Sequence, residues 1–127
     1  MDRPLSDRNH REDVRESARA ARERARTLAA RLLVLRSTAT TKTLTAAVLV
    51  AEAKVLRDSL RATVSSHAQL MRELEEPPER VVTIVKELAA DAARDAMTKA
   101  SADWMKVRAL REDLVRWTID AYYGAPF

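Results

Sequence analysis

The chain has 127 residues, of which 46% are hydrophobic and 33% charged, and it contains a single glycine, four prolines and no cysteine. This composition excludes a disordered or loop-rich chain, and the absence of cysteine excludes a disulfide framework, a thiolate metal site and a thiol nucleophile. The net charge of +4 comes from residues 1–36, where ten arginines stand against six acidic residues. The longest apolar stretch, Leu44 to Ala51, is too short to cross a bilayer, so we expect one soluble, cytoplasmic, all-α domain.

The first predicted helix spans residues 9–36, after a flexible N-terminus at residues 1–8. Asn9 and Glu12 have the spacing of a capping box, which marks a helix start. Apolar residues then follow alternating steps of four and three: Val14, Ala18, Ala21, Ala25, Leu28, Leu32 and Leu35. This heptad seam predicts a helix that packs along one stripe against another helix.

A second helix is expected over residues 43–75, after a turn within the threonine-rich residues 37–43. Its seam has the same spacing: Leu49, Ala53, Leu56, Leu60, Thr63, His67, Leu70 and Leu74. If the chain folds back near Thr40, facing residues have numbers that add to about 81, so Leu32 lies opposite Leu49 and Ala25 opposite Leu56. Large residues then mostly meet small ones, which favours an antiparallel hairpin. The alternative is one continuous helix of more than about 60 residues, paired across a dimer.

Two further helices complete the prediction. Pro77 ends the second helix and Pro78 suits the first turn of a third, over residues 78–98. A fourth spans residues 104–123, with Gly124 as its C-terminal cap. We therefore predict antiparallel helical hairpins that form a four-helix bundle or an elongated helical array.

The arginines of the first helix flank its seam, with Arg15 and Arg22 on one side and Arg24 and Arg31 on the other. Long arginine stems in these positions cover apolar surface and reach acidic groups on a neighbour, as Arg31 would reach Glu52 in the hairpin. We predict that the four arginines contact a protein partner. The alternative is nucleic-acid binding, although acidic residues interrupt the basic run and no aromatic residue precedes Trp104. The mixed charges argue against a membrane surface as the partner.

His67 is the one histidine on an apolar seam, and we expect it to be a core or rim residue. A phosphoryl acceptor of the histidine phosphotransfer kind would usually be followed by lysine and then glycine, but Ala68 and Gln69 follow here. The two histidines and the outward-facing acids do not form a metal-ligating pattern, and one glycine near the C-terminus cannot build a phosphate-binding loop. The sequence therefore predicts no enzyme activity, no metal, no cofactor and no small-molecule substrate.

All five aromatic residues lie in the last 24 positions. Trp117 falls on the seam of the fourth helix and should fill the core. Adjacent tyrosines on a helix point about 100° apart, so Tyr122 and Tyr123 cannot both be in the core, and Phe127 follows Gly-Ala-Pro at the end of the chain. We predict that Tyr122, Tyr123 and Phe127 contact a partner. The functional prediction is a non-enzymatic interaction, regulatory or scaffold module, which self-associates or docks on a partner protein.

Overall fold

The computed structural model describes residues 3–39, 46–99 and 103–124, and these residues form helices and short connections without a strand. The helices are α1 (Arg3–Ala39), α2 (Ala46–Glu73), α3 (Pro78–Lys99) and α4 (Trp104–Tyr122). The protein is all-α, as the composition and the apolar spacing predict.

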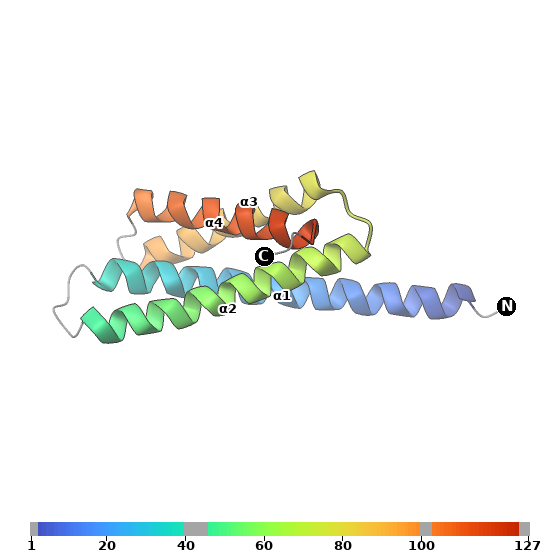
Figure 1. The fold of residues 1–127 in the computed structure, drawn as a ribbon, viewed down its shortest axis with the longest axis horizontal. Helices are drawn as coiled ribbons and strands as arrows, with labels where there is room; N and C mark the ends of the chain where they lie inside the picture. The colour runs from blue at the N-terminus through green and yellow to red at the C-terminus, as the bar shows by residue number, and fades with distance from the viewer. Residues whose placement is uncertain (1–2, 40–45, 100–102, 125–127) are drawn as a thin grey trace.

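The helices form two antiparallel hairpins that stack on each other (Figure 1). α1 packs against α2 and α3, and α4 packs against α2 and α3, whereas the diagonal pairs α1–α4 and α2–α3 have little contact. α1 and α3 run in the same direction, as do α2 and α4 (Figure 1). The hairpin prediction is confirmed, and a continuous helix through α1 and α2 is excluded because α2 packs back along α1.

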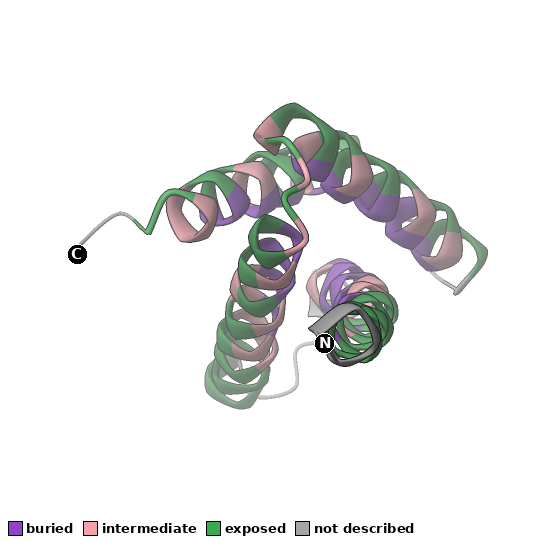
Figure 2. Ribbon diagram, turned by 90° about the vertical axis from the view of Figure 1, so that its right-hand side faces the viewer, coloured by how far each residue is buried: buried purple, intermediate pink, exposed green. Residues whose placement is uncertain are grey.

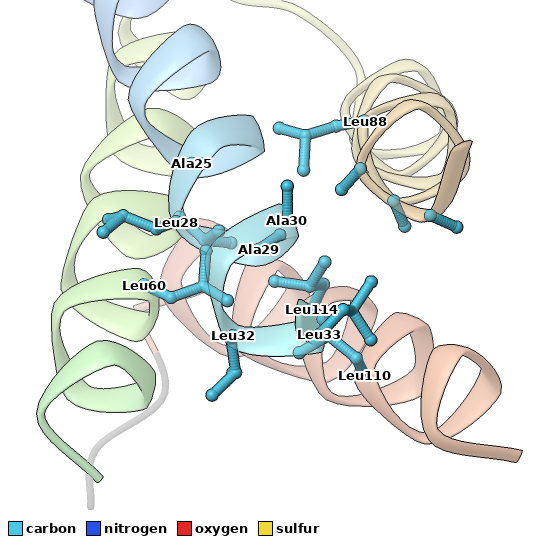
Figure 3. Close-up of a cluster of buried hydrophobic side chains, with 14 of the residues drawn as sticks. Ala25, Leu28, Ala29, Ala30, Leu32, Leu33, Leu60, Leu88, Leu110 and Leu114 are labelled. Carbon is cyan, nitrogen blue, oxygen red and sulfur yellow. The ribbon is translucent and has the colours of Figure 1, made fainter. Parts of the chain in front are cut away.

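The register of the first hairpin is offset from the predicted one. His10 Nε2 lies 2.7 Å from Glu73 Oε1, and Arg11 Nη2 donates to the Leu74 carbonyl at 3.4 Å. These pairs have residue numbers that add to 83 and 85, and in the core Leu28 lies beside Leu60 (Figure 3), a pair that adds to 88 instead of the predicted 81. Before His10, α1 extends past the ends of the other helices (Figure 1).

The core surrounds the C-terminal half of α1. Leu28 lies beside Leu60 of α2, while Leu33 lies between Leu110 and Leu114 of α4 (Figure 3). Alanines on α1 leave room for these large side chains, and Ala25 and Ala29 are completely buried. Figure 2 shows the buried residues on the inward sides of the helices and the exposed residues on the outside. Packing of large against small residues lets the helices approach closely.

Two predicted helix ends differ from the structure. α1 begins at Arg3, so residues 3–8, expected to be flexible, are helical, and Asn9 lies inside the helix rather than at its start. Pro4 is compatible with this earlier start, because a proline in the first turn lacks only an N–H that has no partner within the helix. At the other end, residues 37–39 of the predicted turn belong to α1, and residues 40–45 lie outside the described residues.

The remaining ends follow the predicted punctuation. The turn after α2 places Glu75 at φ 61° and passes through Pro77 into α3. The Asp103 side chain caps α4 by accepting from the Met105 N–H at 2.9 Å. Gly124 takes φ 60° directly after α4 and donates its N–H to the Ala121 carbonyl. Glycine adopts this left-handed conformation without a steric penalty, which explains why the helix ends there.

Candidate interaction surfaces

The four arginines predicted to contact a partner do not form one surface. Arg15 and Arg24 are nine residues apart on α1, which turns their side chains to opposite sides of the helix. Arg15, Arg24 and Arg31 are exposed, and Arg22 is half-buried. No ion pair joins Arg31 to Glu52, although both residues belong to the described part of the chain. Any single partner would therefore contact two of these arginines from one side.

Arginines of α1 do pair with acidic residues of α3. Arg22 Nη2 lies 3.6 Å from Glu87 Oε2, and Arg26 Nη1 lies 3.8 Å from Asp95 Oδ2. The two pairs are four residues apart on α1 and eight residues apart on α3, so each joins a different turn of the two helices. Arg22 thus links α1 to α3, as expected of an arginine that flanks the seam and reaches an acidic residue on a neighbouring helix. The sequence did not predict α3 as the helix that receives them.

His67 lies at the junction of α1, α2 and α3. It is only 3% exposed, and it lines a recess of about 250 Å3 together with Arg15, Arg19, Arg22 and Glu76. Burial, and secondarily the nearby charge of Arg22, lower the pKa of His67 from 6.5 to about 4, so its ring is neutral at pH 7. The core interpretation of His67 is confirmed, and its burial argues against the phosphotransfer alternative.

The aromatic residues of α4 divide between core and surface. Trp117 is buried, with the guanidinium carbons of Arg57 and Arg61 at 5.2 and 5.9 Å from its ring centroid. Tyr122 is half-buried and donates its hydroxyl to the Glu76 carbonyl at 2.6 Å, which ties the end of α4 to the turn between α2 and α3. Tyr123 is exposed and meets the edge of the Tyr122 ring at 5.3 Å. Phe127 lies outside the described residues.

Sequence reasoning missed a groove on the outer side of the second hairpin. One recess of about 250 Å3 lies between α3 and α4, with Ala90, Ala93 and Met97 on one side and Trp104 and Val107 on the other. Met97 is 50% exposed and Trp104 61% exposed. A second recess of about 510 Å3 adjoins it and includes Val115 and Ile119. Lys86 and Arg111 line both recesses, so we describe the two together as the α3/α4 groove.

The rim of the α3/α4 groove is mainly basic. Arg94, Arg108 and Arg116 each pair with an acidic residue of their own helix, namely Asp91, Glu112 and Asp113. Within the described residues, Lys86 and Arg111 have no carboxylate at ion-pair distance. The centre of the groove therefore presents two cations without a partner beside exposed apolar side chains.

The sequence did carry a signal for this groove. Lys86, Ala90, Ala93 and Met97 follow steps of four, three and four, beside the core seam of α3. Trp104, Arg108, Arg111 and Val115 do the same on α4. Such a row is a second apolar and basic stripe on a helix that already has a core stripe. Only the pairing of α3 with α4 places the two rows beside each other.

A hollow of about 600 Å3 between α2 and α4 is a weaker candidate for a docking site. Its one large apolar lining residue, Trp117, is buried, and the remaining lining residues are small, polar or charged. Nowhere in residues 3–39, 46–99 and 103–124 do three His, Asp or Glu side chains gather as metal ligands, and no helix in these ranges has the length and apolarity to cross a membrane. No family model, curated protein or solved structure matches this chain.

Proposed function

We propose that this protein is a non-enzymatic interaction module of the cytoplasm, which receives a helix of another polypeptide in the α3/α4 groove. The observation that carries the proposal is the exposure of Met97, Trp104 and Ile119 along one groove. Contiguous exposed apolar side chains with a charged rim are typical of protein interaction sites, and tryptophan and arginine are enriched among residues that dominate binding energy.

The shape of the groove favours a helix as its occupant. Ala90 is exposed on one wall, next to the buried Ala89 and Ala93, and these small side chains allow the backbone of an incoming helix to come close. Trp104 and Met97 then offer large side chains to fill the spaces between the residues of that helix. The non-enzymatic part of the proposal rests on the absence of a catalytic or cofactor motif in the sequence.

Retention of proteins from a lysate of the source organism tests the docking function. The full chain carries Met97→Asp and Trp104→Asp, and the matched control carries Met105→Asp. Met105 is 69% exposed but does not line the groove. We expect the wild type and the control to retain the same polypeptide, identified by mass spectrometry, and the groove variant to lose it. Equal retention by the wild type and both variants, or retention of no polypeptide by the wild type, contradicts the proposal.

Nucleic-acid binding remains the second candidate function, because one further observation favours it. Arg8, Arg11, Arg15 and Arg19 are exposed and follow steps of three, four and four along α1, so they lie on one side of the helix. Binding through this row would weaken steeply as salt increases and would be lost in Arg15→Glu combined with Arg19→Glu. Affinity for duplex DNA or single-stranded RNA that does not change with salt or with this substitution would exclude it.

A further inference from the structure

α2 carries a second seam whose residues are all exposed, although Asp58 and Ala62 also line the hollow between α2 and α4. Val48, Ala51, Val55, Asp58 and Ala62 follow steps of three, four, three and four, and all five are exposed. Val48 is 52% exposed and Val55 65% exposed. We call these five residues the outer seam of α2, to distinguish them from the seam that faces α1. Spacing of this kind is typical of a helix face that packs against other helices.

The outer seam of α2 and its edges carry two carboxylates and one cation, Lys54, whereas the α3/α4 groove is mainly basic. Asp58 belongs to the seam, and Glu52 lies one helical turn after Val48 at its edge. Neither residue forms an ion pair within the described residues. An apolar helix face with two free carboxylates therefore matches an apolar groove with two unpaired cations, Lys86 and Arg111.

We propose that the α3/α4 groove of one copy of this chain receives the outer seam of α2 from a second copy. This inference rests on the proposed docking function and names the occupant. It covers Met97 and Trp104 of one copy and Val48 and Val55 of the other in a single contact. Two grooves facing each other would instead place Lys86 and Arg111 against like charges, which opposes association.

The contact joins two different surfaces, and this determines the form of the assembly. The second copy uses its α2 and keeps its own α3/α4 groove open for a third copy. Such a head-to-tail contact produces a ring if the rotation closes and an open chain if it does not. The wild-type protein should therefore form species larger than a dimer as its concentration rises.

Sedimentation velocity of the purified full chain over a concentration series tests this assembly. The groove variant carries Met97→Asp and Trp104→Asp, and the seam variant carries Val48→Asp and Val55→Asp. Controls are Met105→Asp for the groove and Val50→Asp for the seam, since Val50 is 68% exposed but lies two residues from Val48 and so off the seam. All substituted residues are exposed, so helix content measured by circular dichroism should stay unchanged.

Each variant alone should be monomeric, while both controls should assemble like the wild type. An equimolar mixture of the two variants should form a 1:1 dimer and nothing larger, because only the intact seam of one and the intact groove of the other can combine. Charge reversal adds an independent test: Lys86→Glu with Arg111→Glu should abolish assembly, and adding Glu52→Lys with Asp58→Lys in the same chain should restore it.

A wild type that stays monomeric overturns the inference, as does assembly that the seam variant leaves intact. In both cases the docking function still depends on the lysate comparison of the groove variant with Met105→Asp. If that comparison also shows no difference, the docking function fails as well. The two proposals can therefore fail separately.

Discussion

The two halves of α1 have the same apolar spacing and opposite environments. From Arg8 to Ala21, Val14 and Ala18 are the buried residues, and the arginines around them are exposed. From Arg22 to Ser37, α2, α3 and α4 enclose the helix, and burial extends beyond the seam to Ala29, Ala30 and Leu33. The heptad seam thus predicts which side of α1 packs against another helix, but not how many helices surround α1.

This difference has a physical origin in the crossing of the two hairpins. α3 and α4 stack on the first hairpin over the C-terminal half of α1, while the N-terminal half extends past them (Figure 1). Alanines at positions 25, 29 and 30 provide the space that three neighbours need. In the N-terminal half the seam has fewer neighbours, and the long stems of exposed arginines such as Arg15 and Arg19 lie beside it. Stability should consequently depend far more on the second half than on the first.

Truncation of one core residue in each half of α1 tests this expectation. Of the changes considered, it should lower the free energy of unfolding most. Leu32→Ala should lower the free energy of unfolding by about 3 kcal/mol, because Leu32 is fully buried and its removal leaves a cavity. Val14→Ala should lower it by about 1 kcal/mol, since fewer methyl groups are lost at a site where the surroundings can adjust. Urea unfolding followed by circular dichroism measures both. Equal losses would show that the two halves are equally enclosed.

His67 of α2 lies where the two halves of α1 meet, beside Arg19 and Arg22. Its protonation should make the stability of the protein depend on pH. The folded-state pKa of about 4 is below the unfolded value of 6.5, so the unfolded chain binds more protons between these values. The contribution of His67 to the free energy of unfolding should therefore be complete above pH 6.5 and should be lost as the pH falls toward 4. The loss at pH 5 should be about 2 kcal/mol relative to pH 7.

Comparison with His67→Gln isolates this effect from the titration of carboxylates. The variant should lose about 2 kcal/mol less than the wild type between pH 7 and pH 5. His10→Gln, at an exposed position near the start of α1, is the control and should follow the wild type. If His67→Gln and the wild type lose stability in parallel, His67 is not the buried neutral group described above.

The smallest effect concerns the ion pair between Arg22 and Glu87. The two side chains are 40% and 61% exposed, so solvent screens their attraction. Glu87→Gln should change the free energy of unfolding by less than about 1 kcal/mol, and this change should vanish at high salt. A larger, salt-independent loss would mean that the pair holds α1 and α3 together more strongly than its exposure indicates.

Sequence reasoning predicted the helices well but did not identify the α3/α4 groove, for different physical reasons. Proline, glycine and the apolar spacing are local signals, and they correctly gave α3, α4 and the turn before Pro78. The early start of α1 was missed because the spacing of Asn9 and Glu12 imitates a capping box inside a helix that begins earlier. The α3/α4 groove was missed because its two rows of residues become one surface only when the helices pair.

The amino-acid sequence by itself determined an all-helical chain, the seams along which α1 and α2 meet, and a basic first segment. These properties follow from spacing and composition, which do not depend on distant residues. The tertiary structure alone decided that α3 pairs with Arg22 and Arg26 of α1, and that Trp104 and the outer seam of α2 remain exposed. Each of these depends on which helices are neighbours, and helix neighbours are set by the packing of the whole bundle.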